Sequence, residues 1–139
     1  MKNKKLGFVG ASRNPKKFGS QVFRHLMDQG YTLIPVHQEA DQIEGLACIQ
    51  SMEQLTPDVK AICLLTPRDK TDDLLRQALE MGIQHIWIQQ FCEGSETLSL
   101  AGASQANIVT GRCLFMYTQP EGLHKMHERM AKIFRVYAN

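Results

Sequence analysis

The stretch LGFVGASRNPKKFGSQVFRHL, residues 6–26, has an apolar run, two glycines and a basic loop ahead of a helical pattern. A strand that turns into a helix in this way presents unpaired backbone N–H groups and the positive end of the helix dipole to an anion. Gly10 would let the chain turn sharply and approach the anion closely. Ser12 could donate a hydroxyl hydrogen bond, and Gly19 could permit close approach at the start of the helix. The stretch therefore predicts a phosphate-binding turn.

Basic residues are concentrated on this loop. Between Lys2 and Lys17 the chain has six Lys or Arg and no acidic residue, whereas residues 28–59 have six acidic residues and no Lys or Arg. Arg13, Lys16 and Lys17 would place positive charge where a bound anion needs it. An ordinary solvated basic edge is the alternative interpretation. The net charge of the chain is only +2, so binding of nucleic acid through bulk charge is not indicated.

Strand-like and helical patterns must position this turn, and they alternate along the chain. The strand-like runs are residues 6–9, 31–36, 59–65, 85–88 and 107–109. Several are apolar nearly throughout, as are strands buried on both faces of a parallel sheet. The alternation implies right-handed crossovers. It predicts a single α/β domain with a Rossmann-like, doubly wound parallel sheet.

Four helical patterns lie between or beside these runs. The first should end at Gly30, a helix-terminating glycine. The second should have Asp69 as its N-cap and stop at Gly82. Ser95 could cap a third helix, and the segment SMEQL, residues 51–55, predicts a short one.

The C-terminal segment PEGLHKMHERMAKIFRVYAN has the pattern of a separate amphipathic helix, with apolar residues at three- and four-residue spacing. We expect residues 1–116 to form the domain and residues 117–139 to form a helical extension. This extension would pack on the sheet layer or on a second subunit, which would make a homodimer. His124 and His127 within it are interpreted as part of a solvated face and not as a metal site.

Ligands of open parallel sheets bind beyond the carboxyl ends of the strands, where the strand order reverses. In this chain that point should lie between the first strand and the run at residues 59–65. Thr66 and Pro67 follow that run, and Val36 and His37 end the second, so all four should face the crevice. His37 is the one candidate acid or base there.

An NAD site is the first alternative. Gly10 and Gly19 are too far apart for the G-x-G-x-x-G fingerprint. The second strand also ends without the acidic residue that would bind a ribose hydroxyl, although Glu39 follows shortly afterwards. The nearby cations favour a more highly charged ligand. An NAD(P)-binding module or oxidoreductase therefore remains the less favoured interpretation.

The ordered set of motifs resembles a known family. The set begins with VGAS and the basic loop, which lead to a helix ending at GY and a strand containing IPV. It continues with LTPDVKAICLLTP, a helix ending at MGI, the run HIWIQ and a last strand running to Cys113. Over about residues 5–116 this is similar to the small stand-alone CoA-binding proteins. It is also similar to the N-terminal CoA-binding domain of the succinyl-CoA ligase alpha subunit.

The resemblance implies CoA or acyl-CoA as the ligand, with its adenosine diphosphate part over the first strand-turn-helix. Carried across by position, the residues that would hold phosphate are Gly10, Ala11, Ser12, Lys17 and Gly19. Those that would flank the nucleotide or close the crevice are Pro35, Val36, His37, Thr66 and Pro67. CoA bears roughly −4 charge in total, from a diphosphate and a 3′-phosphate, which suits the basic loop better than NAD does.

Two positions depart from the family pattern. Family members often have Pro-Val-Asn-Pro where this chain has Pro-Val-His-Gln at 35–38, a difference that concerns the adenosine contacts. They often have glycine where this chain has Phe91, which concerns the pantetheine end. Cys113 is interpreted as a small, partly buried side chain, with a mixed disulfide to CoA as the alternative.

The sequence has no nucleophile elbow, no Walker lysine motif and no paired carboxylates on a shared strand end. The ligases that the chain resembles use an active-site histidine on a further domain. We therefore expect a non-catalytic CoA-binding protein, with a CoA-binding subunit of a multi-chain acyl-CoA ligase as a second alternative. The widely spaced cysteines suit reduced thiols in a cytoplasmic protein, and no apolar run is long enough to span a membrane.

Overall fold

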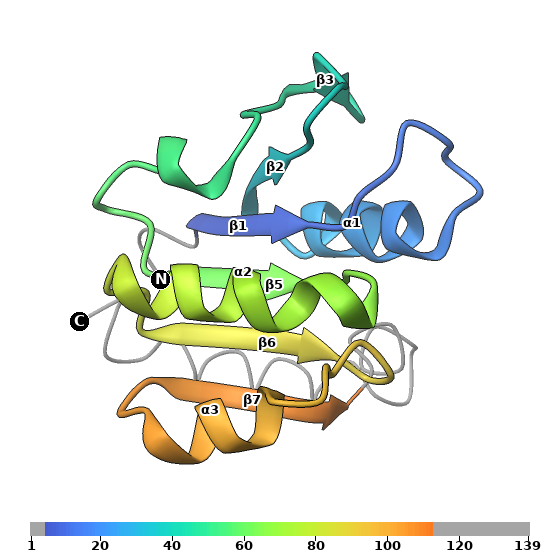
Figure 1. Cartoon of the computed structure of the whole chain (residues 1–139). Helices are drawn as coiled ribbons and strands as arrows, with labels where there is room; N and C mark the ends of the chain where they lie inside the picture. The colour runs from blue at the N-terminus through green and yellow to red at the C-terminus, as the bar shows by residue number, and fades with distance from the viewer. Residues whose placement is uncertain (1–4, 113–139) are drawn as a thin grey trace.

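Five parallel strands form the central sheet of the computed structural model, which describes residues 5–112 (Figure 1). Across the sheet they stand in the order β2-β1-β5-β6-β7. Their bounds are β1 Lys5–Val9, β2 Thr32–Val36, β5 Ala61–Leu64, β6 His85–Gln89 and β7 Asn107–Arg112. Every pairing in this sheet is parallel. The predicted Rossmann-like sheet is confirmed, and its strand order reverses between β1 and β5, as expected.

Some sequence predictions fall on residues that lie outside the described part of the chain. They are the amphipathic helix at residues 117–139 with its possible homodimer contact, the environment of Cys113, and the pair His124 and His127.

Helices cover both faces of the sheet (Figure 1). On one face lies α1, Phe18–Asp28, whose buried Phe23 packs edge-on against Phe8 of β1 with ring centroids 5.2 Å apart. On the other face lie α2, Arg68–Glu80, and α3, Thr97–Ala103. There the core contains Leu75 of α2 beside buried strand residues such as Ile86. The near-continuous apolar runs in the sequence therefore reflect strands that are buried on both sides.

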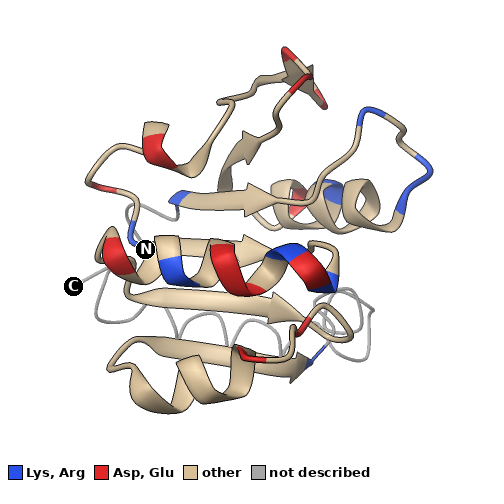
Figure 2. Ribbon diagram, in the orientation of Figure 1, with Lys and Arg blue, Asp and Glu red and all other residues tan. Residues whose placement is uncertain are grey.

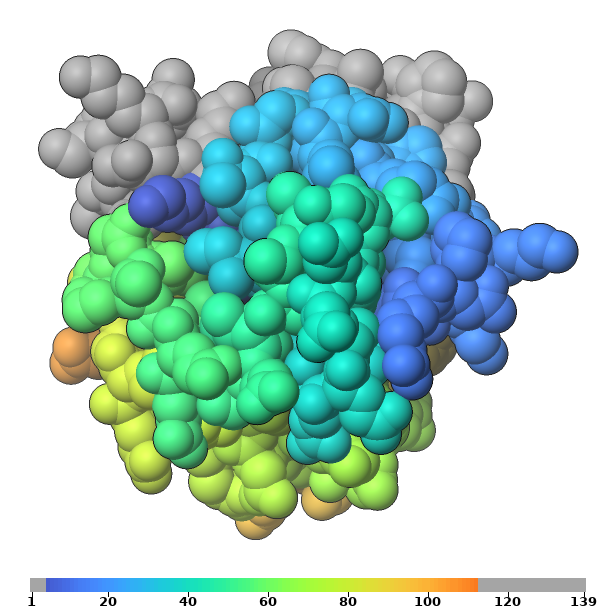
Figure 3. All heavy atoms as spheres, turned by 90° about the horizontal axis from the view of Figure 1, so that it is seen from above, coloured from blue at the N-terminus to red at the C-terminus, as the bar shows by residue number. Residues whose placement is uncertain are grey.

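The connection from β2 to β5 contains a small hairpin of β3, Gln42–Ile43, and β4, Leu46–Ala47. Glu44 and Gly45 turn it with positive φ of 50° and 80°, as a two-residue hairpin turn requires. The short 3-10 helix η1, Met52–Gln54, follows and confirms the predicted SMEQL helix. Figure 3 shows this cyan and green segment beside the blue loop between β1 and α1.

Two predicted helix starts are wrong. Helix α2 begins at Arg68 after Pro67, so Asp69 is a residue of the first turn and not the N-cap. Proline fixes φ near −65°, which suits the entry into a helix. Helix α3 begins at Thr97 after Glu96, and not after Ser95. Its start is set by Asp72 of α2, which accepts hydrogen bonds from residues 96 and 97, a tertiary contact that local sequence does not reveal.

Candidate functional site

Two grooves open at the carboxyl edge of the sheet, on either side of the point where the strand order reverses. The first, called here the α2 groove, has a volume of about 610 Å³ and is lined by residues 9–11, 13, 36–39, 50–52, 65–67, 70, 73, 74 and 77. The second, the β6 groove, has a volume of about 650 Å³ and is lined by residues 10, 12, 17–19, 65 and 89–92. Both grooves include Gly10 and Leu65, so these residues form a shared saddle between them.

Most residues predicted for the site line one of these grooves. Those in the α2 groove are Gly10, Ala11, Arg13, Val36, His37, Thr66 and Pro67. Those in the β6 groove are Gly10, Ser12, Lys17 and Gly19. Lys16 and Pro35 line neither. Lys16 is exposed on the loop, and Pro35 is buried in β2, where its carbonyl accepts a hydrogen bond from the Ile49 N–H at 2.9 Å.

The two glycines of the turn are packed against backbone. Gly10 has φ of +124°, and a Cβ at that position would overlap the carbonyl of Leu65, lying 2.8 Å from its carbon. A Cβ on Gly19 would in turn overlap the carbonyl of Gly10, 3.1 Å from its carbon. The close approach expected at both glycines is therefore found, and its partner is the protein itself. These contacts bring the end of β1, the start of α1 and the end of β5 into one compact junction.

A buried serine that the sequence analysis did not single out fixes the loop. The Ser12 N–H donates to Oγ of Ser20 at 3.0 Å, and that Oγ donates to the Ser12 carbonyl at 2.8 Å. Ser20 is 0% exposed. The Ser12 hydroxyl accepts a hydrogen bond from the Asn14 N–H at 3.0 Å, so its own proton can be donated outward.

Ser20→Ala should lower the free energy of unfolding by about 1–3 kcal/mol. The substitution removes the hydroxyl to which the half-buried N–H and carbonyl of Ser12 are hydrogen-bonded. Urea denaturation followed by circular dichroism measures this. Ser99→Ala, on the exposed side of α3, is the matched control and should change stability by no more than about 0.5 kcal/mol. Equal effects of the two substitutions would remove Ser20 from this role.

Helix α1 starts with its positive end unneutralised by side chains. Its N-cap, Lys17, makes no side-chain cap hydrogen bond, and the first turn has no acidic residue. The preceding loop bears only basic charge, as Figure 2 shows. Backbone N–H groups of a first helical turn and a loop of cations together attract an anion.

Arg13 already has an anionic neighbour within the protein. Its Nη2 lies 3.1 Å from Oε2 of Glu39, and both side chains are largely exposed, at 61% and 74%. The pair joins the β1–α1 loop to the loop after β2 across the mouth of the α2 groove. An exposed pair of this kind contributes little stability, so a phosphate could replace the carboxylate at small cost.

His37 performs the role of an asparagine in the loop after β2. Its Nδ1 accepts hydrogen bonds from the N–H groups of Glu39, at 3.1 Å, and Ala40, at 2.9 Å. An asparagine side-chain oxygen makes the same contacts when it caps a turn. The departure from Asn at this position thus preserves the turn, and it directs the imidazole proton to Nε2. Among residues 5–112, His37 is the only histidine that lines either groove.

Thr66 lies at the α2 groove but is 7% exposed. Its hydroxyl lies 2.7 Å from that of Thr71, which also bonds to the Pro67 carbonyl at 3.1 Å. These hydrogen bonds hold the start of α2 against the end of β5. Thr66 therefore shapes the groove wall, and its hydroxyl is already engaged.

In the wall of the β6 groove formed by residues 89–92, the sequence analysis connects only Phe91 with the site, through the pantetheine end. The end of β6 lies at the same sheet edge as the ends of β1 and β5. Phe91 has φ of +71° and is 72% exposed. Its carbonyl accepts a hydrogen bond from Nε of Arg68 at 2.9 Å. Burial raises the pKa of the neighbouring Cys92 thiol, so its reactive thiolate is disfavoured at neutral pH.

Between residues 5 and 112, no group of three or more His, Cys, Asp or Glu side chains is arranged to hold a metal ion. In the same range, no helix has the length and apolar character needed to cross a bilayer.

The chain is similar in sequence to part of a CoA ligase and to most of a smaller bacterial protein. It is 26% identical over 84 residues to the alpha subunit of the ADP-forming acetate–CoA ligase II of Pyrococcus furiosus. The matched region covers 60% of this chain and 18% of the ligase subunit. The chain thus matches only a small part of the ligase. It is 20% identical over 113 residues to the uncharacterized protein YneT of Bacillus subtilis, covering 81% of this chain and 84% of YneT.

Among solved structures, a conserved hypothetical protein from Pyrococcus furiosus superposes with a TM-score of 0.75 and 31% sequence identity, over 81% of this chain and 97% of that one. The superposition therefore spans nearly the whole of that chain. The resemblance seen in the sequence motifs is confirmed at the level of the family, because residues 4–119 match the family described as the CoA binding domain. The chain belongs to this family of CoA-binding domains.

Proposed function

We propose that this protein binds coenzyme A or an acyl-CoA across the saddle between the two grooves. The diphosphate would lie against the β1–α1 turn, the adenosine in the α2 groove and the pantetheine arm in the β6 groove. The observation that carries this proposal is the meeting of both grooves at Gly10, beside a helix start that has neighbouring cations and no side-chain cap. A long ligand with a charged middle fits this arrangement.

The α2 groove contains cations that could contact an additional phosphate of the nucleotide. Two cations line it, Arg13 and Lys70, the second from the first turn of α2. They are offset by the carboxylates of Glu39 and Asp73 in the same groove. We propose that the 3′-phosphate of CoA replaces the Glu39 carboxylate as the ion-pair partner of Arg13 and also contacts Lys70. Lys70 was missed in the sequence because it lies three residues beyond the expected crevice motif.

The position of Glu39 in the α2 groove also favours the rival ligand NAD. A carboxylate that follows the second strand can accept hydrogen bonds from the hydroxyl groups of a ribose. Thermal-shift titration with CoA, dephospho-CoA, NAD and NADP separates the two. The proposal predicts that CoA raises the melting temperature most and that dephospho-CoA is weaker. Stabilisation by NAD with none by CoA would contradict it.

Lys17→Ala should weaken CoA binding by roughly 3- to 10-fold at low salt, and the loss should shrink at high salt, because the contact is charge-assisted and screened. Isothermal titration calorimetry at two salt concentrations measures both. Lys16→Ala removes the same charge from the same loop but from outside both grooves, so its effect should be smaller. Equal losses from the two substitutions would mean that bulk charge, and not position, attracts the ligand.

We propose that the chain holds CoA without transforming it. Nδ1 of His37 accepts hydrogen bonds from backbone N–H groups of its own loop. The ring proton therefore lies on Nε2, which can donate a hydrogen bond to a ligand but cannot accept a proton from it. The acetate–CoA ligase relatives favour a second candidate, a CoA-binding subunit whose catalytic parts lie on another chain. Affinity capture from a lysate of the source cells, with and without CoA, tests this: recovery of ligase domains with the chain would favour the second candidate.

The cytoplasm is the proposed location. The cysteines within the described residues, Cys48, Cys63 and Cys92, are free thiols, which agrees with a reducing compartment. Cell fractionation would test this, and recovery of the protein outside the cytoplasmic fraction would contradict it.

A further inference from the structure

The β6 groove has an apolar wall. Phe18, at the start of α1, and Phe91, after β6, both line it, and they are 44% and 72% exposed. They are two of the three large apolar side chains that the structure exposes within residues 5–112, the third being Leu98. The lining of this groove includes one cation, Lys17, and no acidic residue. Exposed aromatic side chains gathered in a groove of this kind mark a binding surface for apolar groups.

Phe91 is held in an unfavourable backbone conformation. Its φ of +71° is one that bulky residues avoid, and glycine would adopt it freely. The turn is maintained by the bond from Arg68 to the Phe91 carbonyl and by the Cys92 N–H, which donates to the Gln89 carbonyl at 2.9 Å. A residue that is both strained and exposed does not serve the stability of the fold. Strain of this kind is kept where the side chain has a binding role.

The groove is continuous with the nucleotide-binding part of the site, because Gly10 and Leu65 line both. A ligand whose phosphates lie at the β1–α1 turn would therefore extend its other end along residues 89–92. Gln90 lines this path beside Phe91, so a polar amide as well as an aromatic side chain borders it. The two grooves together thus include charged, polar and apolar lining residues.

We infer that the physiological ligand is an acyl-CoA with an apolar acyl group, and that Phe18 and Phe91 form the acyl-binding subsite. This inference rests on the proposed CoA-binding function and adds the class of ligand to it. Free CoA ends in a small thiol and has no apolar group to place against Phe91. An alkyl chain on the thioester would cover it and gain free energy from the burial of apolar surface.

Isothermal titration calorimetry of the full chain with CoA, acetyl-CoA and hexanoyl-CoA tests the inference. The wild-type protein should bind hexanoyl-CoA about tenfold more tightly than CoA, with acetyl-CoA between them. Phe91→Ala should reduce the ratio of the two affinities to about twofold or less. Phe91→Gly, which also removes the backbone strain, should give the same ratio. Leu98→Ala is the matched control, an equally exposed apolar residue outside both grooves, and should keep the wild-type ratio.

The outcomes separate the two proposals. Binding of CoA without preference for hexanoyl-CoA would overturn the acyl-binding subsite and leave the proposed function standing. A preference that survives in Phe91→Ala and in Phe18→Ala would also overturn the subsite. Absence of binding by every CoA derivative would overturn the proposed function and this inference together.

Discussion

Gly10→Ala should lower the free energy of unfolding by about 2–5 kcal/mol, a large part of the stability of a domain of this size. Two costs combine at this position. An L side chain rarely adopts φ of +124°, which costs about 1–2 kcal/mol. The new methyl group would also overlap the Leu65 carbonyl, which could give way only by displacing the backbone just after β5, at a cost of about 1–3 kcal/mol.

Urea denaturation of the wild-type and variant chains measures this loss. Gly19→Ala should behave similarly, since its Cβ would overlap the Gly10 carbonyl. Gly102→Ala is the matched control: it has ordinary φ and open space around it near the end of α3, so it should raise stability by up to about 1 kcal/mol. A Gly10→Ala protein as stable as the wild type would show that the junction between β1, α1 and β5 is not as tight as described.

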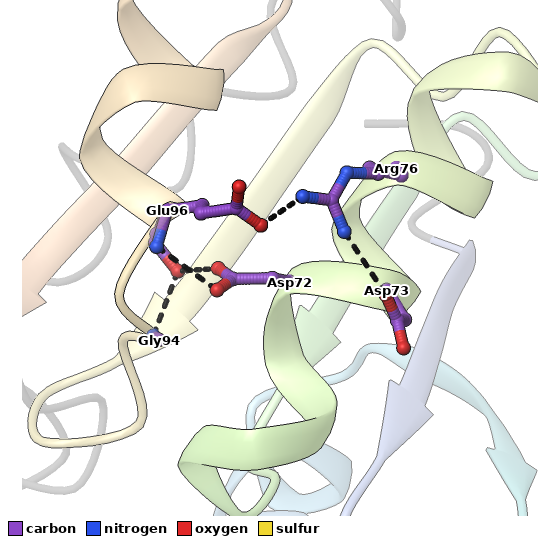
Figure 4. A network of polar contacts seen from close by, with 6 residues as sticks. Asp72, Asp73, Arg76, Gly94 and Glu96 are labelled. Atoms are coloured by element: carbon purple, nitrogen blue, oxygen red, sulfur yellow. Dashed lines mark hydrogen bonds and ion pairs between the residues drawn. The ribbon is translucent and has the colours of Figure 1, made fainter.

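Asp72→Ala should lower the free energy of unfolding by about 2–3 kcal/mol. Its carboxylate, on α2, accepts hydrogen bonds from the Glu96 N–H at 2.9 Å and the Thr97 hydroxyl at 2.5 Å, at the start of α3 (Figure 4). Thr97 is fully buried and in turn accepts from the Gly94 N–H at 2.8 Å. Hydrogen bonds to a charged group contribute about 1.5–3 kcal/mol, and this network fixes the loop that carries Phe91.

Asp73→Ala, at the next residue, is the control in the same denaturation experiment. Its side chain is 85% exposed and pairs with Arg76 at 2.9 Å, so its loss should cost no more than about 0.5 kcal/mol (Figure 4). Arg76 also bonds to Glu96 and would keep that partner. Equal effects of the two substitutions would contradict the assignment of the loop's stability to Asp72.

The fold could be predicted from the sequence because its strongest signals are local. Apolar runs such as residues 59–65 match strands buried on both faces, and Gly30 and Gly82 mark the ends of the helices between them with positive φ. The reversal of strand order followed from the alternation and from the handedness of crossovers. The β3–β4 hairpin was not predicted, since strands of two residues are too short to show an alternating pattern.

The site could be predicted in part. The strand ends pointed to His37, Thr66 and the basic loop, because parallel strands bring their carboxyl ends to one edge. What a side chain does there depends on contacts between distant residues. The bonds between Ser12 and Ser20, the turn capped by His37, and the pair of Arg13 with Glu39 are such contacts.

The second half of the site was missed for a related reason. Within residues 89–92, the sequence shows only a departure from the family pattern at Phe91, which concerns the pantetheine end. Residues 89–92 line the same groove as Lys17 because two contacts between distant residues combine. Strand β6 lies next to β5, and the close packing at Gly10 brings the start of α1 to the end of β5. The expected roles of Lys16 and Pro35 in binding stay predictions, although neither residue lines a groove.

A crystal structure of the protein grown with excess CoA would show directly whether the saddle between the two grooves binds the coenzyme. We expect the diphosphate at the turn between β1 and α1, the adenosine on the His37 side of Gly10 and the pantetheine on the Phe91 side. Well-defined CoA bound elsewhere on the protein, or a turn that stays empty while CoA is present in excess, would overturn this binding mode.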